Sequence, residues 1–110
     1  MWKDYGNNIA EYAFKHIGLS EFAPYICPEC NQNSAHIYMQ VYDLNTRRGG
    51  LWIWCSNCHS FLHSSHYIPL NWVNYEHIET EKLSAVPIYL EELKAEIDMH
   101  VNMHIKQKLL

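Results

Sequence analysis

The sequence predicts an α+β fold, in which a small antiparallel sheet of about three strands is flanked by an N-terminal helix and a long C-terminal helix. Apolar residues recur every three or four positions near both ends of the chain, as on one face of a helix, whereas the middle alternates like a strand. The chain has 110 residues, which is the size of one domain. We therefore expect a single domain, 1–110, with a central module over 24–69 and a connection and helix over 70–110.

The N-terminal helix is expected over residues 1–23. Its apolar stripe, with steps of three and four residues, consists of Trp2, Tyr5, Ile9, Ala13 and Ile17. Gly18 is a suitable stop for this helix. The stripe predicts that the helix packs on the core.

The middle of the chain is predicted to form strands. Residues His36–Tyr42 alternate, so that Ile37, Met39 and Val41 face one side. A polar loop is expected over Asp43–Gly50, followed by an apolar strand over Leu51–Trp54 and a third strand over Phe61–Ile68.

The C-terminal helix is expected to begin near Pro87, because a proline in the first turn costs no hydrogen bond. Its apolar stripe contains Leu90, Leu93, Ile97, Val101 and Ile105. His100 and His104 lie four residues apart beside this stripe. That spacing can hold a metal ion, but no third ligand is evident, so a structural role is the simpler expectation.

The four cysteines form two pairs, Cys27-Pro-Glu-Cys30 and Cys55-Ser-Asn-Cys58. Two residues between cysteines allow a tight turn to aim both sulfurs at one point, and two such turns supply the four thiolates that suit Zn²⁺. A site with four thiolates has no open position for a reactive water, so one structural zinc ion is expected. We also expect the middle segment to depend on this metal for its order.

Other uses of the cysteines are less consistent with the pattern. Disulfides need an oxidising compartment, and the first residues contain no apolar export signal. A redox motif needs only one pair, and haem attachment at Cys55–His59 leaves Cys27 and Cys30 without a role. An iron or iron–sulfur site uses the same ligands as zinc, and the sequence does not distinguish the two.

Cys27, Pro28, Cys30, Cys55 and Cys58, with a predicted hairpin between the pairs, resemble the zinc-ribbon superfamily. The resemblance covers residues 24–69 and implies a bound metal and a ribbon fold, with a treble clef as the alternative. It implies little about function, because zinc ribbons serve in transcription, in ribosomes and as docking modules. In size and style the chain is also similar to small bacterial immunity proteins that neutralise a toxin.

The central histidines do not define an active site. His59, His63 and His66 lack a neighbouring carboxylate ligand and are expected on a polar aromatic face. The segment His77–Glu79 matches half of a zinc-deaminase signature, but it follows both cysteine pairs and neither pair is preceded by proline. A zinc-scaffolded nuclease using His63, His66 and Asn71 is the remaining enzyme alternative, and we expect a protein that is not an enzyme.

Binding to another protein is the favoured functional expectation, with toxin neutralisation as its most concrete form. Trp, Tyr and Arg commonly anchor interfaces, and the candidates here are Tyr38, Tyr42, Arg47, Arg48, Trp52 and Trp54. Nucleic-acid binding is the alternative, because Arg47 and Arg48 lie at the expected hairpin tip. However, the formal charge is −4, and phosphate contact usually needs a larger basic cluster. No apolar run is long enough to span a membrane, and a cytoplasmic location is expected.

Overall fold

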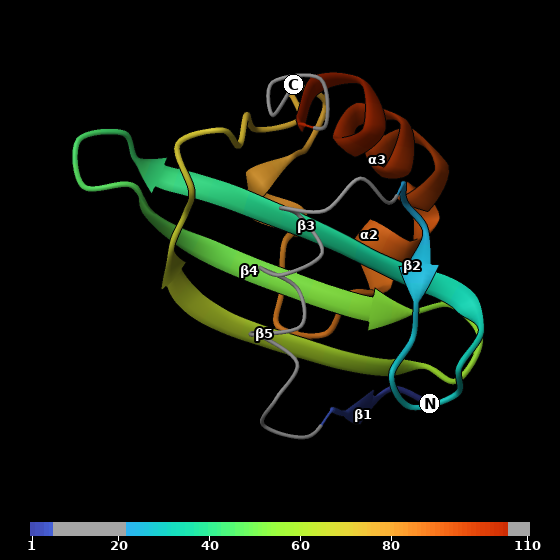
Figure 1. Ribbon diagram of the computed structural model, residues 1–110. Coiled ribbons are helices and arrows are strands. Elements are labelled where there is room, and N and C mark those ends of the chain that lie inside the picture. The colour runs from blue at the N-terminus through green and yellow to red at the C-terminus, as the bar shows by residue number, and fades with distance from the viewer. Residues whose placement is uncertain (6–21, 106–110) are drawn as a thin grey trace.

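Five strands form one mixed sheet in the computed structural model, which describes residues 1–5 and 22–105 (Figure 1). In chain order the strands are β1 (Lys3–Asp4), β2 (Tyr25–Ile26), β3 (Asn33–Asp43), β4 (Arg48–Cys55) and β5 (Ser60–Tyr67). Their order across the sheet is β1-β5-β4-β3-β2. The long strands β3, β4 and β5 are antiparallel neighbours, β2 is antiparallel to β3, and β1 runs parallel to β5.

The prediction of about three strands flanked by two long helices is wrong. Beyond the five strands, the described residues contain only short helical segments, namely η1 (Thr80–Lys82), α2 (Ile88–Glu92), α3 (Lys94–His100) and the π-helical η2 (Val101–Ile105). The expected C-terminal helix is divided at Leu93, whose φ of −105° and ψ of 13° leave the helical region. An interruption of one residue barely changes the phase of an apolar stripe, so the periodicity does not reveal it. No helix in this part of the chain is long and apolar enough to cross a membrane.

The N-terminal helix is also not found at the start of the chain, where Lys3–Asp4 form β1. The Lys3 N–H donates to the His59 carbonyl at 2.9 Å, and the Tyr5 N–H donates to the Phe61 carbonyl at 2.8 Å. The edge of β5 thus supplies backbone partners for an extended segment, and this pairing overrides the helical spacing of Trp2 and Tyr5. The rest of the predicted helix, residues 6–21, lies outside the described residues.

Aromatic side chains of β3 and β4 fill the side of the sheet that faces α2 and α3. Tyr38 lies opposite Trp52 in the register, and both are buried. The indole nitrogen of Trp52 donates to the Ser84 carbonyl at 2.7 Å, and that of Trp54 donates to Glu91 of α2 at 2.9 Å. On the opposite face the buried residues are Ile37, Met39, Leu51 and Ile53. Both faces of the central strands therefore belong to the core.

The segment after β5 closes the part of the β3 edge that β2 does not reach. Asn74 acts like a strand residue, because its Oδ1 accepts from the Val41 N–H at 2.8 Å and its Nδ2 donates to the Val41 carbonyl at 3.1 Å. The Trp72 indole donates to the Met39 carbonyl at 2.6 Å. These three bonds satisfy backbone groups that would otherwise form an open sheet edge.

The expected loop over Asp43–Gly50 is shorter in the structure, because β4 already begins at Arg48. Asp43 accepts from the Asn45 N–H at 2.9 Å, and Arg47 closes the turn with a φ of 60°. Gly49 and Gly50 are therefore buried strand residues and not turn residues. A Cβ at Gly49 would collide with the carbonyl oxygen of Gln40, so this position requires glycine for space.

We expect Gly49→Ala to lower the free energy of unfolding by about 3 kcal/mol, because the added methyl meets backbone that cannot move without breaking the ladder. Ser65→Ala, at an exposed position of β5, is the control and should change it by less than about 0.5 kcal/mol. Urea unfolding followed by tryptophan fluorescence measures both. Equal stability of the two variants would contradict the close approach at Gly49.

Candidate metal centre

The sheet brings the four cysteine sulfurs into one cluster. Their Sγ atoms all lie within 4.8 Å of one another, with Cys27 3.7 Å from Cys58 and Cys30 3.6 Å from Cys55. Four sulfurs placed tetrahedrally at ~2.3 Å from one ion are about 3.8 Å apart. A disulfide would require about 2.05 Å, and all four cysteines are free. The cluster can therefore hold one metal ion.

The register of β3 and β4 fixes the distance between the two cysteine turns. The first turn lies between β2 and β3 and the second between β4 and β5, and Ala35 pairs directly with Cys55. The Ser56 N–H also donates to the Ser34 carbonyl at 3.0 Å. The turns are thus held face to face by backbone hydrogen bonds of the sheet.

Both cysteine turns have the same backbone geometry. The N–H of Asn31 donates to the Cys27 carbonyl at 2.8 Å, and the N–H of His59 donates to the Cys55 carbonyl at 3.0 Å. Asn31 has a φ of 64° and His59 a φ of 60°, and asparagine and histidine tolerate this left-handed region better than most residues. His59 therefore has a backbone role in its turn, and its ring packs on Trp2 with a centroid separation of 4.8 Å.

Each sulfur has a polar side-chain neighbour within hydrogen-bond distance. Three of them can donate to a thiolate, namely Tyr5 at 2.9 Å from Cys27, Asn57 at 3.4 Å from Cys30 and Ser34 at 3.0 Å from Cys55. At the fourth sulfur, the Cys58 thiol donates to Ser60 Oγ at 3.3 Å. Such outer groups orient metal ligands and stabilise their negative charge. The sequence reasoning missed all four. Only Asn57 could have been suspected from the sequence, because it lies between Cys55 and Cys58.

The surroundings of Cys27 and Cys30 shift the pKa values of the two thiols in opposite directions. Burial raises the pKa of the Cys27 thiol, even though the hydrogen bond from Tyr5 opposes this effect. The hydrogen bond from Asn57 lowers the pKa of Cys30. Burial also raises the pKa of Tyr5, which keeps its hydroxyl protonated as a donor. A metal cation must therefore displace a proton from Cys27, and its affinity for the site rises with pH.

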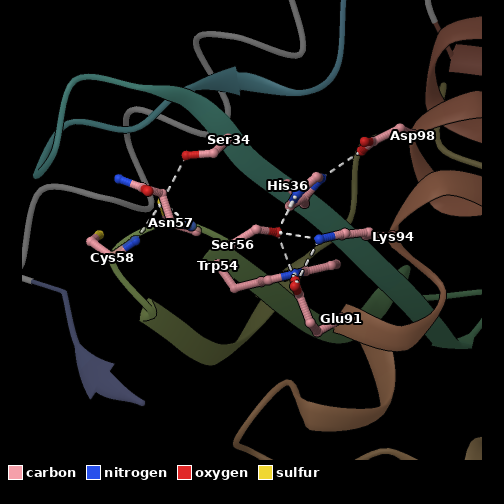
Figure 2. A network of polar contacts seen from close by, with 10 residues as sticks. Ser34, His36, Trp54, Ser56, Asn57, Cys58, Glu91, Lys94 and Asp98 are labelled. Carbon is pink, nitrogen blue, oxygen red and sulfur yellow. Dashed lines mark hydrogen bonds and ion pairs between the residues drawn. The ribbon is translucent and has the colours of Figure 1, made fainter. Parts of the chain in front are cut away.

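A chain of polar contacts joins the second cysteine turn to the helices (Figure 2). Ser56 lies between Cys55 and Cys58, and its Oγ is 2.8 Å from Nε2 of His36 on β3. The other ring nitrogen, Nδ1, is 2.9 Å from a carboxylate oxygen of Asp98 on α3. His36 is buried, so these contacts connect the second cysteine turn through the sheet to α3.

Glu91 of α2 completes this network. One carboxylate oxygen accepts from the Ser56 hydroxyl at 2.8 Å and the Trp54 indole at 2.9 Å, and the other accepts from Lys94 at 3.0 Å. Burial alone would raise the pKa of Glu91. The hydrogen bonds from Ser56, Lys94 and Trp54 outweigh burial and hold the pKa below its ordinary value.

The line of Ser56, His36 and Asp98 also resembles the arrangement that activates a nucleophilic serine. In that chemistry the serine gives its proton to the histidine. Here the single hydroxyl proton of Ser56 goes to Glu91, because a carboxylate has none to donate. The geometry therefore fits a link between the cysteine turn and the helices better than an activated nucleophile.

The residues predicted to contact a partner have different surroundings. Tyr38, Trp52 and Trp54 are buried in the sheet, with at most 2% of their surface exposed, whereas Tyr42 is 63% exposed. The Arg47 guanidinium donates to backbone carbonyls, those of Ile68 at 3.3 Å, Pro69 at 2.6 Å and Trp72 at 3.0 Å. Arg48 is exposed.

The candidate histidines also take separate places. His63 stacks on Trp52, with ring centroids 4.4 Å apart. His100 lies 27 residues after Val73 in the chain and contacts its carbonyl through Nε2 at 2.6 Å. Among the residues that the structure describes, His, Cys, Asp and Glu side chains gather in a group of three or more only at the four cysteines.

No family model matches the chain, and comparisons with curated proteins and with solved structures find no significant match.

We expect Glu91→Ala to lower the free energy of unfolding by about 2–3 kcal/mol, because Ser56, Trp54 and Lys94 lose a shared charged acceptor. Glu92→Ala removes the exposed neighbouring carboxylate and should cost less than about 0.5 kcal/mol. Urea unfolding of both metal-loaded variants measures the difference.

The pH dependence gives a second check on the same variant. A lowered folded-state pKa means that the stabilisation by Glu91 is present above its ordinary pKa of about 4.3 and is lost as the pH falls through the lowered value. The difference between wild type and Glu91→Ala should therefore be equal at pH 7 and pH 5.5. A difference that halves over this interval would contradict the lowered pKa.

Proposed function

We propose that this chain is a structural zinc protein, in which one Zn²⁺ is bound by Cys27, Cys30, Cys55 and Cys58. The observation that carries the proposal is the cluster of four sulfurs within 4.8 Å of one another. Zn²⁺ accepts such a tetrahedral thiolate set because it has no geometric preference of its own. With all four positions taken by protein sulfur, the ion has no open position for catalysis.

The structural role of the metal follows from the strands that the four cysteines connect. Tyr5, next to β1, contacts Cys27, and the two cysteine turns connect β2 to β3 and β4 to β5. Structural zinc contributes ~10–16 kcal/mol of apparent binding free energy, compared with a typical net stability of ~5–15 kcal/mol for a domain. Metal binding is therefore large enough to determine whether this part of the chain is ordered.

The test is metal analysis of the purified chain followed by chelation. We expect about one zinc ion per chain, and loss of the tryptophan fluorescence of the folded state when a strong chelator removes it. Iron in place of zinc, or a fold that survives complete metal removal, would contradict the proposal.

Two variants separate the ligands from their surroundings. Cys30→Ser removes a ligand and should lower the zinc affinity at least about 100-fold. His59→Asn keeps a residue that tolerates a φ of 60° and should retain zinc and stability. Loss of zinc from His59→Asn would show that the histidine has a role beyond its turn.

We further propose that the chain binds a protein partner through an apolar surface at the end of the β3–β4 hairpin. This hairpin-end patch consists of Leu44, Leu70 and Val73, which are 76%, 76% and 39% exposed and line a cavity of about 390 Å³. Exposed apolar residues around a hollow commonly mark protein contacts. Neutralisation of a basic toxin is the most specific form of this function, because residues 76–110 carry six Glu and one Asp against four Lys.

The nucleic-acid alternative has less support. Arg47 uses its guanidinium on backbone carbonyls, which leaves Arg48 as the exposed arginine of the hairpin. Binding to a phosphate backbone usually involves several cationic contacts.

A pull-down from native lysate, with and without nuclease, tests the protein-binding proposal. We expect one stoichiometric protein that persists after nuclease treatment and is lost with Leu44→Asp/Leu70→Asp. Ile88→Asp, which changes an apolar residue that is 58% exposed on α2, should retain the partner. Equal capture by both variants would exclude the hairpin-end patch, and capture that disappears with nuclease would favour nucleic acid.

A further inference from the structure

A second group of metal-binding side chains lies at the end of α3, far from the cysteines in sequence. The dipeptide Met-His occurs twice with a spacing of four residues, as Met99-His100 and Met103-His104. Side chains four residues apart lie on the same side of a helix, so the two methionines form one such pair and the two histidines form another.

These side chains line a hollow of the surface. The cavity measures about 150 Å³ and is lined by Tyr75, Glu96, Met99, His100, Met103 and His104. Met99 is 62% exposed and Met103 is 50% exposed, whereas Met39 is fully buried in the sheet. The two thioethers thus reach solvent beside a cavity, in contrast to the methionine that fills the core.

One ring nitrogen of His100 is fixed by the backbone. Its Nε2 lies 2.6 Å from the Val73 carbonyl oxygen, which can only accept, so Nε2 carries the proton. A metal ion would therefore bind this residue through Nδ1. A backbone carbonyl that fixes the second ring nitrogen is the usual support of metal-binding histidines.

The separation of the two imidazoles fits a shared ion. Their ring centroids are 4.9 Å apart. Two imidazoles bound to one metal at ~2.0–2.1 Å and at a tetrahedral angle have centroids about 5 Å apart. The pair therefore needs little movement to bind one ion.

We propose that Met99, His100, Met103 and His104 form a second metal site, and that its ligand is Cu(I). The two histidines alone are too few for a metal site. Among the described residues, His, Cys, Asp and Glu side chains form a group of three or more only at the four cysteines. The two thioethers complete the ligand set, and thioether sulfur favours a soft ion such as Cu(I).

The experiment uses the zinc-loaded full chain labelled with ¹³C at the methionine methyl groups. Cu(I), kept reduced by ascorbate under anaerobic conditions, is added in steps and followed by NMR. The methyl signals of Met99 and Met103 should shift together, while those of Met39 and Met1 should stay in place. Copper taken up only at the cysteines would release zinc and leave all four methyl signals unchanged, which would overturn the proposal.

Metal content gives an independent readout. After desalting, Met99→Leu/Met103→Leu should hold about one copper ion fewer per chain than wild type, because the remaining imidazole pair binds Cu(I) too weakly. Met39→Leu removes a thioether that is buried in the sheet, outside the cavity, and should hold as much copper as wild type. Equal copper in all three proteins would overturn the proposal. An unchanged zinc content of the double variant shows that it remains folded.

Discussion

The crowding of four sulfurs that must lose their protons to bind a metal is the constraint on which this structure depends. Sulfur atoms 3.6–3.7 Å apart would, once deprotonated, repel one another by about 4 kcal/mol per pair at an effective dielectric constant of ~20. A cation at their centre converts this repulsion into attraction. The two cysteine turns can then stay face to face, and the sheet register that holds them there is compatible with the charge.

The same centre is connected to the helices by buried polar groups. Ser56 belongs to the second cysteine turn and also contacts His36 and Glu91, so α2 and α3 are connected to the sheet beside the cysteine cluster. Buried charges are costly unless each has its partners. Glu91 has three donors here, and its lowered pKa reflects them. A change in the second cysteine turn would therefore affect the placement of the helices as well.

The cysteine spacing was sufficient to predict that the four sulfurs come together, because two short turns and an intervening hairpin leave few other arrangements. The alternation of residues likewise predicted the central strands. Periodicity failed at Lys3–Asp4, where pairing with β5 overrides a helical pattern, and at Leu93, where a short break preserves the phase of the stripe. Gly49 looked like a turn residue, although the close approach of Gln40 explains the glycine.

The polar side chains around the sulfurs could not be predicted from the sequence, for a different reason. Tyr5, Ser34 and Ser60 reach the cysteines through the sheet and not through a local motif. Their roles depend on strand pairing between distant segments, which no short window of the sequence contains.

The two edges of the sheet come from the first part of the chain, whereas the centre comes from the consecutive strands β3, β4 and β5. During synthesis on the ribosome, β1 therefore emerges long before its partner, since Lys3 pairs with Ser60. Closing such a long loop is slow compared with forming hairpins. The nascent chain should consequently build the centre of the sheet first and add β1 last.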